Sequence, residues 1–197
     1  MDQEQNAHIK NEIVEWIKAI LIAGVLVVVI RMFIFQPFVV DGPSMRPNFY
    51  TGERLIVNKL IYSIHPPRRG EVIVFLAPEG KDYIKRVIAL PGETIKVDGD
   101  DVYINGKKIA EPYIADAIKE AHKTRPVYNF TRDFKYVNGK LQAVTVPKDH
   151  VFVMGDNRPD SKDSRYEDVG FVPYDKIIGR ADFVFWPLKK IHLINHY

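Results

Sequence analysis

The sequence contains no cysteine, which excludes disulfides, cysteine-ligated zinc, iron–sulfur clusters and a thiol nucleophile. Glycine (12) and proline (13) are too few for a collagenous or low-complexity protein. Basic residues exceed acidic ones by only three, so the charge gives no support for nucleic acid as a partner. The mean hydropathy of −0.16 excludes a protein built from many membrane-spanning helices.

Several cofactor and catalytic motifs are also missing. The sequence has no glycine-rich phosphate loop, and none of its six histidines lies in an H-E-x-x-H or G-x-S-x-G context. An acidic loop at 155–165 is one possible metal site, but Arg158, Lys162 and Arg165 in the same loop would repel a cation. We therefore expect neither a cofactor nor a metal ion.

What is present is a globular composition with an apolar N-terminal segment. Hydrophobic residues make up 46% of the 197 residues and charged residues 27%, which fits one ordinary domain or two very small ones. Residues 19–35 are apolar except for Arg31, which lies near one end and can extend towards lipid headgroups. Trp16 stands where an interfacial aromatic residue would lie.

This pattern predicts a single transmembrane helix over residues 13–36, preceded by a short segment at 1–12. Two alternatives are a cleavable signal peptide and a buried core helix. The acidic start and bulky exit argue against the first, and the all-round hydrophobicity of the run, with no polar stripe, argues against a surface helix. The distribution of basic residues does not decide the orientation, because long domains translocate largely regardless of charge.

The remaining residues, 37–197, predict a mainly β domain of barrel-like or sandwich-like type. Short apolar runs bounded by glycine and proline occur at 72–76, 83–90, 151–154 and 183–186. Asn105-Gly106 between two alternating segments predicts a tight hairpin. Residues 111–143 are polar and less patterned, and we interpret them as an insertion containing one short helix near 114–123.

Three segments carry side chains that could perform chemistry. Ser44 lies between two prolines, which restrict its backbone, although serines in turns are common. Strand alternation places Lys85 on one face with Tyr83 and Val87. If that face is buried, desolvation lowers the lysine pKa and makes the amine a base near neutral pH. The alternative is a lysine that extends into water.

The third segment, residues 154–165, is rich in side chains that stabilise tight loops, and Asp163 and Arg165 are well placed to pair. We interpret it as a rigid clamp rather than as a set of catalysts. A surface turn with incidental charges is the alternative.

Together these segments resemble the type I bacterial signal peptidases, membrane-bound Ser–Lys proteases that remove leader peptides from exported proteins. The resemblance covers about residues 13–187 and includes a single preceding span, as in the short form of the family. It rests on three motifs in order: Gly42-Pro43-Ser44-Met45-Arg46-Pro47, Tyr83-Ile84-Lys85-Arg86-Val87-Ile88-Ala89-Leu90-Pro91-Gly92-Glu93, and Gly155-Asp156-Asn157-Arg158 with Ser161 and Asp163-Ser164-Arg165.

The resemblance implies a role for each matching residue. Ser44 would be the nucleophile, Lys85 the general base, and Ser161 a hydroxyl that orients the lysine. The Ser44 N–H would contribute to the oxyanion hole. The supporting positions would be Gly42, Asp163, Arg165 and Gly155. Residues that line pockets for small substrate side chains at −1 and −3 would be Phe38 and Val40.

Some positions depart from the family pattern. Asn48 replaces the usual threonine, and Gly42 stands where some relatives have a serine hydroxyl, which leaves the second oxyanion donor open. Pro43 has no N–H to donate, and Pro159-Asp160 is also unusual. None of these positions is one of the two proposed catalytic residues.

The resemblance also implies partners and location: signal peptides of exported preproteins, the lipid bilayer, and a single-pass protein with its catalytic domain on the extracytoplasmic side. Two alternatives remain from other classes. One is a self-cleaving Ser–Lys autoprotease of related fold, against which the apolar span argues. The other is a membrane-anchored β domain without catalytic activity. The sequence does not indicate an oligomeric state.

Overall fold

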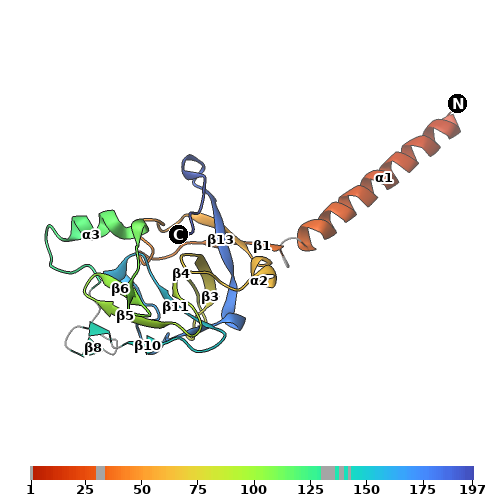
Figure 1. Cartoon of the computed structure of the whole chain (residues 1–197). Helices are drawn as coiled ribbons and strands as arrows, with labels where there is room; N and C mark the ends of the chain where they lie inside the picture. Colours follow the sequence, from red (N-terminus) through yellow and green to blue (C-terminus); the bar gives the residue numbers. More distant parts are fainter. Residues whose placement is uncertain (1, 30–33, 130–135, 138–139, 142) are drawn as a thin grey trace.

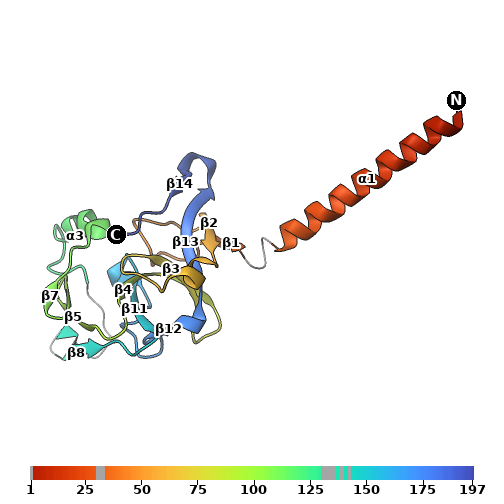
Figure 2. The ribbon, with the colours of Figure 1, turned by 45° about the vertical axis from the view of Figure 1, so that its right-hand side comes forward.

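A computed structural model describes residues 2–29, 34–129, 136–137, 140–141 and 143–197. A long helix, α1 (Asp2–Val29), is followed by a β-rich part, and α1 lies apart from the strands in both views (Figures 1 and 2). The short helices are α2 (Ile61–Ile64) and α3 (Ala115–Ala121). No helix in the described ranges combines the length and the apolar character needed to cross a membrane.

The described strands form two antiparallel sheets, which confirms the mainly β prediction. The larger sheet has the order β1-β2-β13-β3-β4-β11-β12, with β14 paired to β13, and the smaller has the order β7-β6-β5-β9-β8, with β10 paired to β5. The strands of the larger sheet are β1 (Phe35–Val39), β2 (Arg54–Asn58), β3 (Val72–Leu76), β4 (Asp82–Ala89), β11 (His150–Met154), β12 (Val172–Pro173), β13 (Ile177–Trp186) and β14 (His192–Leu193). Those of the smaller sheet are β5 (Thr94–Asp98), β6 (Asp101–Ile104), β7 (Lys107–Lys108), β8 (Tyr136–Val137), β9 (Lys140–Leu141) and β10 (Val144–Thr145).

The start of the β-rich part differs from the predicted boundary at residue 36. Phe35 and Gln36 belong to β1, and Pro37 lies inside that strand. Proline lacks an N–H and is tolerated at a sheet edge, where one side of the strand needs no partner. β1 is such an edge, since it pairs only with β2 in the larger sheet. Pro37, which disfavours a helix before it, is therefore also compatible with the edge strand β1.

Local turn chemistry explains the hairpin between β6 and β7. Asn105 has φ of 51° and Gly106 has φ of 79°, as a two-residue turn with both central residues left-handed requires. Three buried clusters form the core, and one of them contains residues of both sheets. A second packs Val40, Met45 and Phe49 against the larger sheet, and so fixes the chain on both sides of Ser44.

The predicted insertion at 111–143 is described in part. Its first half contains a 3₁₀ turn over Pro112–Ile114 and then α3, which agrees with the short helix expected near 114–123. Residues 130–135, 138–139 and 142 of the insertion lie outside the described ranges. α3 lies at the opposite end of the β-rich part from β1 (Figure 1).

Candidate active site

Ser44 lies in a turn directly after β1. Gly42 adopts φ of +87°, a left-handed conformation that favours glycine, and the turn is closed by the Arg46 N–H, which donates to the Pro43 carbonyl at 3.0 Å. The neighbouring Met45 side chain is fully buried, which anchors the turn in the core. The main chain around Ser44 is therefore held from both sides.

Lys85 projects from β4 towards this turn. Its Nζ donates to Ser44 Oγ at 2.8 Å and to the Ile84 carbonyl at 2.8 Å. Its side chain is 3% exposed, and the Tyr83 ring lies 4.9 Å from Nζ, on the face that strand alternation predicts. Burial lowers the pKa of Lys85 from 10.5 to about 8, against the carboxylates of Asp163 and Asp156, which favour the charged amine.

Asp163 is the centre of a buried clamp beneath this pair. Its carboxylate accepts from Arg165 Nε and Nη2, both at 2.8 Å, from the Gly155 N–H at 2.9 Å and from Ser161 Oγ at 2.7 Å. Burial alone would raise the pKa of Asp163, but the Arg165 guanidinium and these donors hold that pKa below its usual range. The carboxylate therefore stays ionised and fixed.

Gly155 provides the close approach that the resemblance implies. A Cβ atom at this position would lie 2.1 Å from Ser161 Oγ and 2.4 Å from the Ser44 carbonyl oxygen. Both distances are far below van der Waals contact. Only a residue without a side chain lets the 155–161 loop pack against the Ser44 turn.

Ser161 differs from its implied role of holding the lysine directly. Its hydroxyl donates to Asp163, and among the described residues the hydrogen bonds of the Lys85 amine go to Ser44 and Ile84. The ionised carboxylate draws the Ser161 proton towards itself, because a charge-assisted hydrogen bond is stronger than a neutral one. In this structure Ser161 therefore affects Lys85 indirectly, by holding the Asp163 carboxylate whose charge acts on the amine.

The motif that contains Gly155 also contacts the segments of Ser44 and Lys85 through Asp156. This carboxylate accepts from Arg86 Nε at 2.9 Å and Nη2 at 2.7 Å, and Arg86 directly follows Lys85. It also accepts from Asn48 Nδ2 at 2.7 Å, and the same amide donates to the Tyr113 carbonyl at 2.9 Å. Asn48, a departure from the family pattern, thus links the Ser44 turn to the loop and to the insertion. Its amide offers two donor hydrogens where threonine offers one.

Sequence reasoning also missed Asn157 and the buried pair Arg158–Glu111. The Asn157 N–H donates to the Ser44 carbonyl at 3.0 Å and its Nδ2 to the Pro43 carbonyl at 3.1 Å. Arg158 pairs with Glu111 with both side chains buried, at 0% and 6% exposure. Asn157 and Arg158 belong to the third motif, so the sequence offered a signal for both residues. Nothing in the sequence indicated that Glu111 is the partner of Arg158.

A cavity of about 300 Å³ opens above the Ser44–Lys85 pair. Phe38 and Val39 of β1 and Tyr83 and Ile84 of β4 are among the residues that line it. Val40, expected to line a pocket, is instead 1% exposed and belongs to the core cluster. Its side chain does not reach the cavity because it packs in the interior with Met45 and Phe49.

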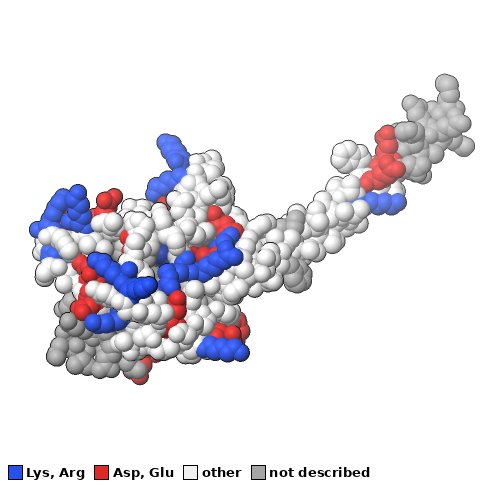
Figure 3. Space-filling view, viewed as in Figure 1, with Lys and Arg blue, Asp and Glu red and all other residues white. Residues whose placement is uncertain are grey.

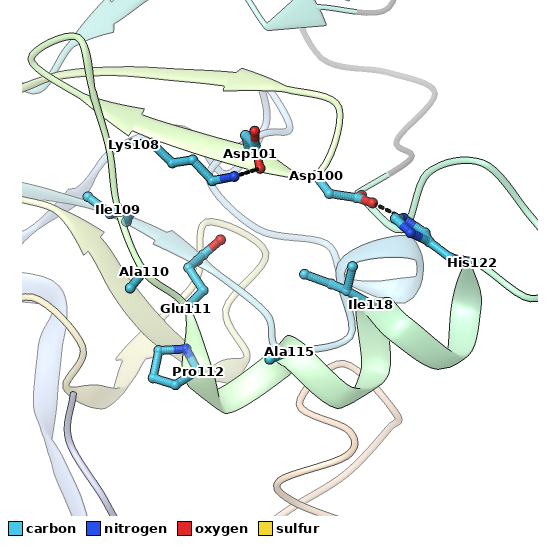
Figure 4. A pocket seen from close by; sticks show the side chains of 10 residues that line it. All are labelled: Asp100, Asp101, Lys108, Ile109, Ala110, Glu111, Pro112, Ala115, Ile118 and His122. Carbon is cyan, nitrogen blue, oxygen red and sulfur yellow. Dashed lines mark hydrogen bonds and ion pairs between the residues drawn. The ribbon is translucent and has the colours of Figure 1, made fainter.

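A second, charged cavity lies between the β6–β7 hairpin and the start of the insertion, and it shares no lining residue with this site. It has a volume of about 470 Å³, and its carboxylates Asp101 and Asp100 pair with Lys108 and His122 (Figure 4). Within the described residues, no group of three His, Asp or Glu side chains could hold a metal ion. The chemistry available at Ser44 is that of a hydroxyl next to a buried amine of lowered pKa.

The family model described as signal peptidase, peptidase S26, matches residues 13–186. The chain belongs to this signal peptidase family. The match includes all three motifs and both members of the Ser44–Lys85 pair.

Similar members of the signal peptidase family occur in bacilli. The chain is 44% identical over 182 residues to a signal peptidase I of Bacillus amyloliquefaciens, covering 92% of each chain. It is 43% identical over 182 residues to signal peptidase I T of Bacillus subtilis, covering 92% of this chain and 89% of that one. A crystal structure of a signal peptidase I from Enterococcus faecalis is 41% identical, covers 58% of this chain and 95% of that one, and gives a TM-score of 0.48.

Proposed function

We propose that this signal peptidase is a serine endopeptidase that cleaves signal peptides from exported preproteins, with Ser44 as nucleophile and Lys85 as general base. The observation that carries the proposal is the 2.8 Å contact between Ser44 Oγ and a buried amine whose pKa is lowered to about 8. A base with a pKa near the working pH combines an available neutral form with enough strength to take a proton.

In the first half-reaction, the neutral Lys85 amine takes the proton of Ser44 Oγ as that oxygen attacks the scissile carbonyl carbon. The Ser44 N–H stabilises the oxyanion that forms. Gly42 brings no hydroxyl to this region, so the second donor is a different group. The Lys85 ammonium then gives its proton to the departing amine, and the peptide C–N bond breaks.

The second half-reaction releases the signal peptide from Ser44. Lys85, neutral again, takes a proton from a water molecule as the water oxygen attacks the ester carbon. The ester C–O bond breaks, and the Ser44 oxygen recovers its proton from the Lys85 ammonium. The amine therefore acts twice as a base and twice as an acid, which requires its pKa to lie near the working pH.

Four residues keep the pair in this arrangement. Asp163 and Arg165 neutralise each other in the interior and leave the Lys85 amine in a fixed electrostatic field. Ser161 holds one oxygen of Asp163, and Gly155 allows the loop to approach the Ser44 carbonyl. All four act as positioning residues rather than as partners in proton transfer.

The substrate binds as an extended strand beside β1, the exposed edge of the larger sheet. Alternate substrate side chains then point into the cavity next to Phe38 and Val39, which explains a preference for small residues at −1 and −3. Val40 supports this wall from the core side.

α1 supports a location at the membrane. Its side chains from 19 to 29 are apolar and exposed, for example Leu21 at 63% and Ile22 at 68%. The charged side chains of this helix lie further from the β-rich part (Figure 3). We infer that this apolar part of α1 anchors the protein in the bilayer as a single span. The β-rich part lies on the extracytoplasmic side, where signal peptides emerge.

Cleavage of a purified precursor by the wild type, Ser44→Ala and Lys85→Met tests the proposal. We expect cleavage at the signal peptide junction by the wild type and none by either variant. Lys85→Met should remain folded, because it replaces a buried amine with an apolar side chain of similar length. Activity retained by either variant contradicts the assignment, and cleavage of the chain itself without any precursor cleavage indicates an autoprotease.

A further inference from the structure

A second cleft, of about 500 Å³, lies on the other side of the Ser44 turn. Gly42 and Ser44 line the catalytic cavity, whereas Arg46 and Pro47, which come next in the chain, line this cleft. Its other walls are the face of α3 that carries Glu120 and the segment that follows this helix. The Ser44 turn is thus the partition between the two hollows.

Asn157 connects this cleft to the nucleophile. Its side chain borders the cleft, and its N–H and Nδ2 hold the carbonyls of Ser44 and Pro43 at 3.0 and 3.1 Å. β1 and α3 lie at opposite ends of the β-rich part (Figure 1). The Ser44 turn contributes to one hollow lined by β1 residues and to another lined by α3 residues. A substrate strand that lies along β1 and crosses Ser44 therefore continues towards α3.

The acidic side chain of the cleft has an ion-pair partner, whereas its two basic side chains have none among the described residues. Glu120 is paired with Lys123 at 2.6 Å. Arg46 and Arg125 have no carboxylate partner in the described part of the chain, and each guanidinium lies over a tyrosine ring, at 5.5 and 5.4 Å from the ring centre. Basic side chains also gather over the α3 end of the visible face (Figure 3). A guanidinium held in this way is suited to bind a carboxylate through two hydrogen bonds.

We propose that this cleft binds the mature-protein side of the precursor and that Arg46 and Arg125 select acidic side chains shortly after the scissile bond. The inference rests on the proposed function, because it assigns the leaving-group side of the same reaction. Arg46 and Arg125 are specificity-determining residues here, since they contact the part of the substrate that departs as the free amine.

The test uses three precursors that are identical except for the second to fourth residues after the cleavage site, which are all Asp, all Asn or all Lys. The wild type should cleave the Asp precursor with a kcat/KM about fivefold above that of the Lys precursor, the size expected for one exposed ion pair. The preference should disappear in 1 M salt, where such charges are screened within about 3 Å. Arg125→Glu should reverse the order.

Lys119→Glu is the matched control. It makes the same change of charge on α3, but Lys119 does not line the cleft. This variant should keep the wild-type order of the three precursors. Equal effects of Lys119→Glu and Arg125→Glu would overturn the proposal, because they would indicate a general field instead of a binding site.

The Asn precursor separates this inference from the proposed function. If the wild type cleaves it but shows no difference between the Asp and Lys precursors, the cleft does not select charge and the inference is wrong while the proposed function stands. If the wild type cleaves none of the three, the proposed function fails, and the inference that rests on it fails as well.

Discussion

Position 155 has no room for a side chain. Gly155→Ala would force its Cβ against Ser161 Oγ and the Ser44 carbonyl, at 2.1 and 2.4 Å, so the nucleophile turn or the loop has to move. A displacement of about 1 Å at a reacting group costs on the order of 100-fold in rate, and we expect a loss of at least this size in kcat.

Gly24→Ala is the matched control for this prediction, because a Cβ there meets no atom within 4 Å. It should retain wild-type cleavage of a precursor in the same assay. Gly155→Ala with near wild-type kcat would show that the loop tolerates the displacement and that its close approach to Ser44 is not needed.

At the scale of elements, the insertion is coupled to the 155–161 loop through Arg158 and Glu111. Removing one member of a buried ion pair leaves the other charge without compensation, which costs about 3–5 kcal/mol. Arg158→Met should therefore lower the free energy of unfolding in urea by about this amount. The double variant Glu111→Leu, Arg158→Met should recover part of the loss, because no buried charge remains.

The exposed pair Lys123–Glu120 on α3 provides the comparison. Lys123→Met should leave the unfolding transition nearly unchanged, since both side chains are largely in water. If Arg158→Met is as stable as Lys123→Met, the buried pair does not hold the insertion to the loop.

The strands and the hairpin that depend on local sequence patterns were predictable from the sequence. The hairpin at Asn105–Gly106 follows from its turn residues, and the runs at 72–76 and 151–154 are strands β3 and β11 because their side chains are almost all buried. The run at 183–186 is the end of one long strand, β13, which begins at Ile177. Arg180 does not interrupt this strand because Glu71 and Asp182 neutralise its charge.

The candidate site was also predictable in part, because local strand alternation determines which side chains share a face. Alternation placed Lys85 beside Tyr83, and the structure confirms that its face is buried. The contacts of Asn48 with Asp156 and of Glu111 with Arg158 join residues far apart in the sequence. No periodicity or motif indicates such pairs, because they depend on how the two sheets and the insertion pack.

At the scale of the whole molecule, the proposed anchor is confined to α1. Wild-type protein in membranes should stay in the pellet after an alkaline carbonate wash. Leu21→Glu combined with Leu26→Glu should release it, since a charged residue costs about 2.5–3.5 kcal/mol at the centre of a membrane helix. Leu193→Glu, at an exposed apolar residue of β14, is the control and should remain in the pellet. Release of the control, or retention of the double variant, contradicts an anchor in α1.

The pH dependence of kcat/KM on a neutral precursor tests the account most directly. Lys85 has to be neutral to take the Ser44 proton, and its pKa is lowered to about 8 because the amine is buried. The neutral fraction falls as pH drops below this value, so kcat/KM should rise with pH, with a midpoint near 8, and level off above it. A rate that stays constant from pH 8 down to 5, or that declines only with a carboxylate midpoint near 4, would contradict Lys85 as the base.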